Sequence, residues 1–295
     1  MNFRILTYFL TVAREQSLTR AAELLHITQP TLSRQLVQLE DELGVKLFDR
    51  SQRRLTLTTA GRFLQQRGLE IIELVDKTTV DIQEQETNLQ GNICFGAGEI
   101  KAVTLLADII TAFQKQNPLV TFDLLTYTTD VIKDKTDKGL IDIALLQEPV
   151  DMVNFDFIRL PVQEKVCVVM RSDHPLASKA AISAADLEGQ AVLIPSRLSI
   201  RSDIINWLSG SIARIHLAGT CNLAGNLHIL IERGNYCAIS IEPPSLGSQL
   251  TLRPLTPPME SRVMLGWKRG VQHSITVQKF IEFAQCFSGI DTYAK

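Results

Sequence analysis

Two apolar stripes at helical spacing, separated by a break of only a few residues, constrain the beginning of this 295-residue chain more than any other feature. Ser17 is placed to cap the first stripe and Thr28 the second, and Gly44 follows the second. A third amphipathic pattern predicts a helix over 3–14. The apolar positions of the three are Phe3, Leu6, Phe9, Leu10 and Ala13; Ala21, Ala22, Leu24 and Leu25; and Leu32, Leu36, Leu39 and Leu43. Two short helices joined by a tight turn at His26 are typical of a helix-turn-helix.

The side chains that the last stripe leaves outside are mostly small and polar. Gln can pair with adenine edges and Arg with guanine edges, while hydroxyls and a helix N-terminus can hold phosphates. The alternative is a solvated face on a structural helix, and we rank it below nucleic-acid contact because the segment that follows points the same way. The residues predicted to contact DNA on this helix are Thr28, Gln29, Pro30, Thr31, Ser33, Arg34 and Gln38.

That segment, residues 46–58, reads as a β-hairpin or wing. Two short apolar stretches flank a polar tip with Arg50, Arg53 and Arg54, which suits contact with phosphates or the minor groove. Residues 1–68 contain ten Lys and Arg against six Asp and Glu, whereas the remainder contains 20 against 26. A basic head on an acidic body indicates that only the head meets a polyanion.

The run "SLTRAAELLHITQPTLSRQLVQLEDELGVKLFDR", followed by "LTLTTAG", resembles the N-terminal signature of LysR-type transcriptional regulators. The resemblance covers about the first 65 residues and is specific, because turn, helix and wing agree in both order and spacing. It implies an all-α winged helix-turn-helix over 1–58, a linker helix, an effector-binding domain and a homo-oligomer, expected to be a dimer of dimers on pseudo-palindromic promoter DNA.

A long helix is predicted over 59–88, with a hinge at 89–92. Its seven-residue repeat consists of Leu64, Gly68, Ile71, Val75, Thr78, Ile82, Gln85 and Leu89. One interpretation is a dimerising helix, which nothing nearby in the sequence would otherwise cover. The other is a helix that lies on its own domain.

From residue 93 onward, strand-like and helix-like segments alternate, which predicts an α/β domain over 93–295 with mostly parallel strands and helices on both faces. Strands are predicted at 93–97, 120–125, 141–146, 166–170, 191–194, 213–218, 236–241 and 263–267, and helices at 102–116, 129–138, 200–209, 223–233 and 275–287. The fragments "GNICFGAG", "LLADIITAFQKQNPLVTFDLL", "KGLIDIALL" and "RSDHPLA" resemble the effector-binding domain of the same family, whose fold is similar to periplasmic binding proteins. The resemblance implies subdomain I over 93–161 and 267–295 and subdomain II over 162–266.

In such folds, ligands bind beyond the carboxyl ends of strands and at helix N-termini. Hydroxyls, backbone N–H groups and two arginines favour a small carboxylate as effector, although Glu99 argues against a purely anionic ligand. Thr128 and Asn222 could instead only cap helices, and Arg197 could be solvated. The predicted effector-binding residues are Gly98, Glu99, Ile100, Thr128, Thr129, Ser196, Arg197, Ser199, Arg201 and Asn222. The chain departs from many members of the family at residues 234–237, where Tyr236 replaces a second glycine.

Other functions are less well supported. The glycines after the strand at 93–97 do not complete a dinucleotide-binding loop, because Lys101 takes the place of the third glycine. The motifs of zinc proteases, serine hydrolases and P-loops are absent, and the five histidines lack metal-ligand spacing, so no catalytic residue, metal or cofactor is predicted. A transport-type binding protein would need a signal peptide, and none is visible.

Five cysteines lie far apart and form no C-x-x-C pair, so free thiols in a reducing compartment are expected. A redox trigger at Cys221 or Cys237 is a minority alternative. No apolar run approaches the roughly 18 residues that span a bilayer, and the protein is expected in the cytoplasm.

Overall fold

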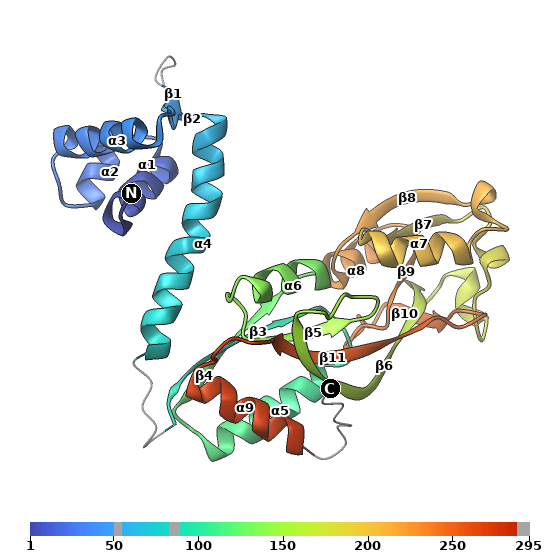
Figure 1. The fold of residues 1–295 in the computed structure, drawn as a ribbon. Coiled ribbons are helices and arrows are strands. Elements are labelled where there is room, and N and C mark those ends of the chain that lie inside the picture. Colours follow the sequence, from blue (N-terminus) through green and yellow to red (C-terminus); the bar gives the residue numbers. More distant parts are fainter. Residues whose placement is uncertain (50–54, 83–88, 288–295) are drawn as a thin grey trace. The chain divides into compact units, whose positions relative to one another are not determined.

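The computed structural model describes residues 1–49, 55–82 and 89–287, in two compact units that divide after Val80 (Figure 1). The fold class is as predicted, with a helix-turn-helix unit, a long helix and an α/β unit. Among the described residues, no helix is both long enough and apolar enough to cross a bilayer. The wing tip at 50–54 and the predicted end of the long helix at 83–88 lie outside the described residues.

The first unit begins with three helices at the predicted places: α1 (Phe3–Glu15), α2 (Leu18–Leu24) and α3 (Gln29–Leu43). The hydroxyl of Ser17 accepts a hydrogen bond from the N–H of Arg20, so it caps α2 as expected. Gly44 ends α3 in the left-handed region, at φ 68°. His26, at φ 54°, makes the turn between α2 and α3.

The core of this unit is formed by the predicted stripes. Leu6, Phe9, Leu32, Leu36 and Leu39 are at most 1% exposed. Three predicted core positions are wrong: Phe3, Leu24 and Leu43 are 54%, 51% and 41% exposed. Each lies at or near an end of its helix, where no neighbouring element covers it.

The wing consists of β1 (Phe48–Asp49) and β2 (Thr56–Leu57), paired antiparallel. The long helix α4 (Thr59–Ile82) follows, and the Thr58 hydroxyl caps it by accepting a hydrogen bond from the N–H of Gly61 at 3.0 Å. Its 24 residues extend about 36 Å at 1.5 Å each.

Both interpretations of the long helix find support along its length. Ala60, Leu64 and Ile72 pack on the core of the first unit, and Gly68 lies against Leu6 and Leu10, so this face of α4 covers its own domain. The other faces carry large exposed apolar side chains: Phe63, Leu69, Ile71, Leu74 and Ile82.

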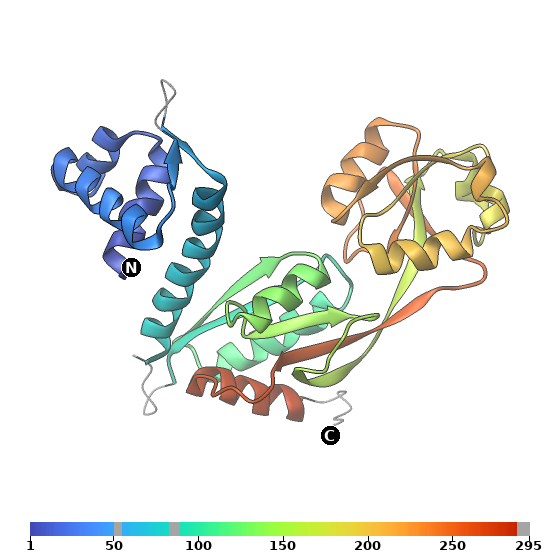
Figure 2. The same cartoon turned by 45° about the horizontal axis from the view of Figure 1, so that its top comes forward.

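The second unit contains two α/β/α lobes (Figures 1 and 2). Lobe I consists of the parallel strands β3 (Gly91–Ala97), β4 (Val120–Thr126) and β5 (Ile143–Gln147) with three helices. Helices α5 (Val103–Gln116) and α9 (Ile275–Cys286) pack on one face of its sheet, and α6 (Thr129–Asp137) on the other.

Lobe II repeats this plan with the parallel strands β7 (Ala191–Pro195), β8 (His216–Cys221) and β9 (Cys237–Ile241). Helix α7 (Leu198–Trp207) covers one face and α8 (Ala224–Arg233) the other. Three short 3₁₀ helices complete the lobe: η1 (Pro175–Ser178), η2 (Ala184–Leu187) and η3 (Ile212–Arg214).

Two long antiparallel strands join the lobes (Figure 2): β6 (Phe155–Arg171) and β11 (Glu260–Lys268). A further strand that was not predicted, β10 (Leu250–Pro254), pairs with β6. The expectation of mostly parallel strands holds within each lobe for β3, β4, β5, β7, β8 and β9, whereas β6, β10 and β11 pair antiparallel. Val263 and Leu265 already lie in the core of lobe I, so the chain returns there earlier than the predicted boundary at Trp267.

Candidate functional site

The exposed face of α3 consists of the side chains predicted to contact DNA. Thr28, Gln29, Pro30, Thr31, Arg34 and Gln38 are exposed, and Ser33 is half-buried. The hydroxyl of Thr28 lies 2.8 Å from that of Thr31 and makes no side-chain cap bond to the backbone. The face therefore combines hydroxyls, amides and one guanidinium on a helix that is anchored by its leucine stripe. Arg50, Arg53 and Arg54 lie outside the described residues.

Glu40 anchors the other end of α3 to the wing. Its carboxylate accepts hydrogen bonds from the N–H groups of Leu47 at 2.9 Å and Phe48 at 3.1 Å, and from Lys46 Nζ at 3.0 Å. Burial by itself would raise the pKa of Glu40, but these bonds outweigh it and hold the pKa below its ordinary value. The sequence analysis missed this role, because an acidic residue in a charged run reads as solvated.

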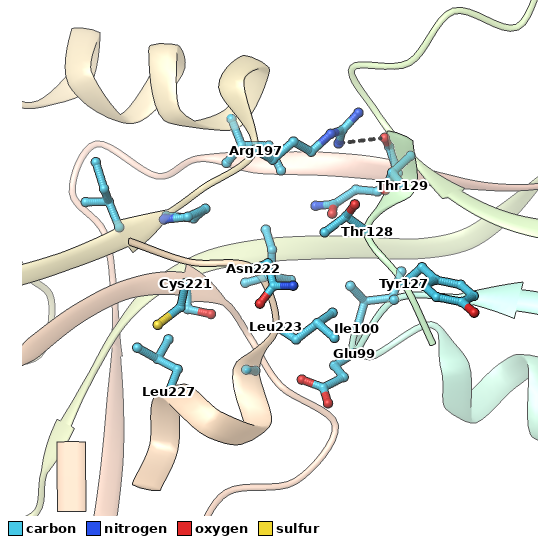
Figure 3. Close-up of a pocket in the computed structure, with 18 of the residues that line it drawn as sticks. Glu99, Ile100, Tyr127, Thr128, Thr129, Arg197, Cys221, Asn222, Leu223 and Leu227 are labelled. Atoms are coloured by element: carbon cyan, nitrogen blue, oxygen red, sulfur yellow. Dashed lines mark hydrogen bonds between the residues drawn. The ribbon is translucent and has the colours of Figure 1, made fainter. Parts of the chain in front are cut away.

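A cavity of about 90 Å³ lies between the lobes of the second unit (Figure 3). Lobe I contributes the segments after β3, β4 and β5, and lobe II contributes the segments after β7 and β8 together with the first turns of α7 and α8. These are the carboxyl ends of parallel strands, where the topology rule places ligands.

Seven of the ten predicted effector residues line this cavity, and three do not. Those that line it are Gly98, Glu99, Ile100, Thr128, Thr129, Arg197 and Asn222. Ser196, Ser199 and Arg201 lie outside the lining, because the lobe II loop turns only Arg197 inward. Asn222 does not cap α8, since Leu223 takes the cap position, whereas Thr128 does take the cap position of α6.

Arg197 reaches from lobe II to lobe I and is not solvated. Its side chain is 7% exposed, and its Nε lies 3.1 Å from the Asp130 carboxylate. Its two terminal nitrogens donate to the backbone carbonyls of Gln147 at 3.4 Å and Pro149 at 2.6 Å. The predicted convergence of two arginines on a ligand is therefore wrong, because Arg197 is held by the protein and Arg201 lies elsewhere.

Glu99 reaches in the opposite direction, from lobe I to lobe II. Its Oε2 accepts a hydrogen bond from the N–H of Gly225 at 2.7 Å, in the first turn of α8. A carboxylate at a helix N-terminus is stabilised by the free N–H groups and by the helix dipole. Glu99 and Arg197 thus tie the lobes together at the cavity.

The loop that carries Glu99 is held from behind by Glu164 of β6. This carboxylate is fully buried and accepts hydrogen bonds from the N–H of Ala102 at 2.7 Å and of Lys101 at 3.2 Å. Burial raises the pKa of Glu164 despite these bonds. Its role could not be read from the sequence, because its partners lie about 60 residues away.

Several lining residues were missed, among them Tyr127, Gln147, Leu223, Leu227 and Ser240. Tyr127 and Leu223 directly adjoin predicted residues, so a wider window around each strand end would have found them. Tyr236, the departure from the family pattern, packs against Gly234 and is not part of the lining.

The cysteines and histidines do not form a reactive centre in the described part of the chain. Cys167, Cys221, Cys237 and Cys286 are free thiols, and no group of three or more His, Cys, Asp or Glu could hold a metal ion among the described residues. Cys221 lines the cavity. Cys237 is buried 3.6 Å from His174 Nε2, and burial raises the pKa of its thiol to about 11.

Comparison with known proteins accounts for both units. The family pattern described as "Bacterial regulatory helix-turn-helix protein, lysR family" matches residues 3–62, and that of the "LysR substrate binding domain" matches residues 86–287. The chain belongs to the LysR family. This family consists of transcriptional regulators rather than enzymes.

Individual LysR proteins resemble the chain over different spans. It is 34% identical to the Hca operon transcriptional activator HcaR of Escherichia coli over 191 residues, 64% of this chain and 63% of HcaR. It is 34% identical to the regulator BsdA of Bacillus subtilis over 174 residues, 59% of each chain. The matches thus span about three fifths of these relatives.

The fold of a solved LysR structure extends over nearly the whole chain. CbnR, a LysR family transcriptional regulator, superposes with a TM-score of 0.76 at 20% identity, covering 96% of this chain and 98% of CbnR. CbnR in complex with its target DNA gives 0.75 at 19% identity over the same shares.

Proposed function

We propose that this LysR-family chain binds promoter DNA through α3 and the wing, and that a small molecule in the cavity between lobes I and II controls it. The observation that carries the proposal is the exposed, uncharged-polar face of α3 with Arg34 at its centre, on a helix whose opposite face is buried. A regulator that binds operator DNA works in the compartment that holds the DNA, so we place the protein in the cytoplasm.

The residue types on α3 suit the reading of base edges. Arg34 can bond a guanine edge in bidentate fashion, and Gln29 and Gln38 can pair with adenine. Thr28 and Thr31, beside the first turn, suit phosphates. That CbnR was solved with its target DNA supports this assignment, since both chains share the fold.

A homodimer would present two copies of α3 to a pseudo-palindromic site. The exposed apolar side chains Phe63, Ile71 and Leu74 on α4 support pairing through this helix. We propose a dimer that assembles further into a dimer of dimers.

Control by a ligand would work as a shift between two arrangements of the lobes. A ligand that binds one arrangement more tightly raises its population, and in a dimer of dimers this changes the placement of the DNA-binding units and the bending of the DNA. A small carboxylate is the ligand class that the sequence favours, whereas the charges in the cavity favour a different class.

The proposal is tested by binding of the full chain to a selected operator and to random DNA at several salt concentrations. Replacement of Arg34 by Ala should weaken operator binding by about 1–3 kcal/mol and leave binding to random DNA nearly unchanged. Arg14→Ala is the matched control, because Arg14 is an exposed arginine of the same unit that lies on α1.

An equal loss on both DNAs would make Arg34 a phosphate contact. Operator binding that survives Arg34→Ala unchanged would contradict the assignment of α3 as the reading helix.

A cysteine trigger is the second candidate, and the structure disfavours it at Cys237. Its pKa of about 11 leaves almost no thiolate at neutral pH, and the thiolate is the reactive form. Cys221 is the more accessible of the two, as it is half-buried in the cavity wall.

A further inference from the structure

The charges around the cavity decide which ligands it can hold. Among the described residues that line it, only Glu99 and Arg197 are charged. All three guanidinium nitrogens of Arg197 already have acceptors in lobe I. Its charge is already paired with Asp130, and three of its five N–H donors are in use, which weakens its pull on an entering anion.

At the N-terminus of α8, one N–H group already has a carboxylate acceptor. Glu99 Oε2 receives the N–H of Gly225 at 2.7 Å, so the chain itself supplies the carboxylate at this helix N-terminus. A second carboxylate in the cavity would lie beside a like charge, which raises its free energy. Glu99 thus makes the cavity unfavourable for anions and attractive for cations.

His228, one turn further along α8, does not neutralise this charge. Burial lowers the pKa of His228, although Glu99 and Glu232 act against the shift. The imidazole is therefore neutral at pH 7 and above. Its buried Nε2 has no hydrogen-bond partner among the described residues.

A neighbouring cavity is acidic. It has a volume of about 210 Å³ and shares Gln147, Ile200 and Ile241 with the first. Its charged lining residues in the described part of the chain are Glu148, Asp203 and Glu260, all of them acidic. Arg197 is therefore the one described cation in either cavity lining, and its charge is already paired with Asp130.

We propose that the cavity between the lobes takes a small organic cation, a primary ammonium on a short apolar body, with Glu99 as its counter-ion. This inference rests on the proposed role of the cavity as the effector site. Ile100, Leu223 and Leu227 supply the apolar wall, and Figure 3 shows them around the same space as Glu99 and Asn222. The volume of about 90 Å³ limits the ligand to a small molecule.

Thermal unfolding of the full chain with three four-carbon probes at matched ionic strength tests the ligand class. The probes are n-butylammonium chloride, sodium n-butyrate and n-butanol, which share a skeleton and differ in charge. Butylammonium should give a saturable rise in Tm of about 2–4 °C, and the other two should not. A rise with butyrate or butanol alone, or with none of the three, would overturn the proposal.

Glu99→Gln tests the counter-ion, because the amide oxygen can still accept the Gly225 N–H while the charge is lost. The butylammonium concentration at half-saturation should rise at least tenfold. Glu282→Gln is the matched control, since Glu282 is an exposed carboxylate on α9 that pairs with Lys279. A Glu99→Gln chain that responds to butylammonium as the wild type does would contradict the role of Glu99.

The outcome separates this inference from the proposed function. A Tm rise with butyrate would overturn the cation and leave a regulator with a ligand between its lobes. Equal binding to operator and random DNA would contradict the proposed role as a regulator. A response to butylammonium would then still show that the cavity binds a cation.

Discussion

The carboxylate of Glu40 is 2% exposed and accepts the N–H groups of Leu47 and Phe48, where α3 meets the wing. Leu47 and Phe48 also pack in the core with the leucines of α3, so Glu40 adds a polar contact to an apolar one. The position of α3 relative to the wing therefore depends in part on one ionised group that lies away from the proposed DNA face.

Glu40→Ala should lower the free energy of unfolding of the first unit by about 2–3 kcal/mol at pH 7, because two buried N–H groups lose their acceptor. Denaturant unfolding at pH 7 checks this value. Asp41→Ala is the control on the neighbouring exposed position and should change stability by less than about 0.5 kcal/mol.

The same carboxylate should give the unit an acid dependence. Since folding lowers its pKa below the ordinary 4.5, the stabilisation is complete above that pH and is lost as the pH falls through the folded-state pKa. The difference between wild type and Glu40→Ala should therefore shrink on acidification below about pH 4.5. A difference that stays constant down to pH 3 would show that Glu40 acts through packing rather than charge.

The sequence periodicity predicted which side chains are buried better than it predicted which polar groups bond to each other. Leu32, Leu36 and Leu39 were placed correctly because a 3.6-residue repeat decides which side faces the core. The partners of Arg197 were not, since Asp130 and the carbonyls of Gln147 and Pro149 lie about 50 to 70 residues away. Such pairs depend on the final arrangement of the lobes, which no local pattern encodes.

At the scale of elements, α4 begins in close contact with the wing. A Cβ added at Gly61 would lie 2.1 Å from the carbonyl oxygen of Leu47 and 2.9 Å from Leu57. Only glycine allows the first turn of α4 to approach this backbone so closely.

Gly61→Ala should therefore destabilise the first unit by about 1–3 kcal/mol, although alanine favours helix by about 1 kcal/mol. Thermal unfolding of the full chain would measure it. Gly68→Ala is the matched control, because its Cβ would meet only the flexible ends of Leu6 and Leu10. A Gly61→Ala protein as stable as the Gly68→Ala protein would contradict the close approach.

The elements most difficult to predict were those that cross between lobes. β6 was predicted only at 166–170, yet it is a strand of 17 residues whose first part pairs in lobe I. No strand was predicted at 155–165, where pairing with β11 keeps the segment extended. Strands β3, β5, β7 and β9 were found because their buried apolar runs are visible without any partner.

At the scale of the whole molecule, the proposed dimer depends on α4. Phe63 and Leu74 lie 11 residues apart, about three helical turns, and so share one face at 66% and 41% exposure. Leu69, 56% exposed, is turned about 140° away from Leu74.

Leu74→Glu should convert the dimer to a monomer at micromolar concentration and weaken binding to a two-half-site operator at least tenfold, since the avidity of two reading helices is lost. Sedimentation and operator titration would measure both effects. Leu69→Glu, on the other face, should leave both unchanged. If both variants remained dimeric, α4 would not be the pairing helix.

The contacts that Glu99 and Arg197 make between the lobes differ from ordinary salt bridges, because they include main-chain atoms. Glu99 holds a main-chain amide, and Arg197 holds two main-chain carbonyls in addition to Asp130. Every residue type offers a main-chain carbonyl, so substitution of Gln147 or Pro149 leaves the two carbonyl acceptors of Arg197 in place. Substitutions that change how readily the two lobes separate are therefore expected mainly at Glu99, Asp130 and Arg197.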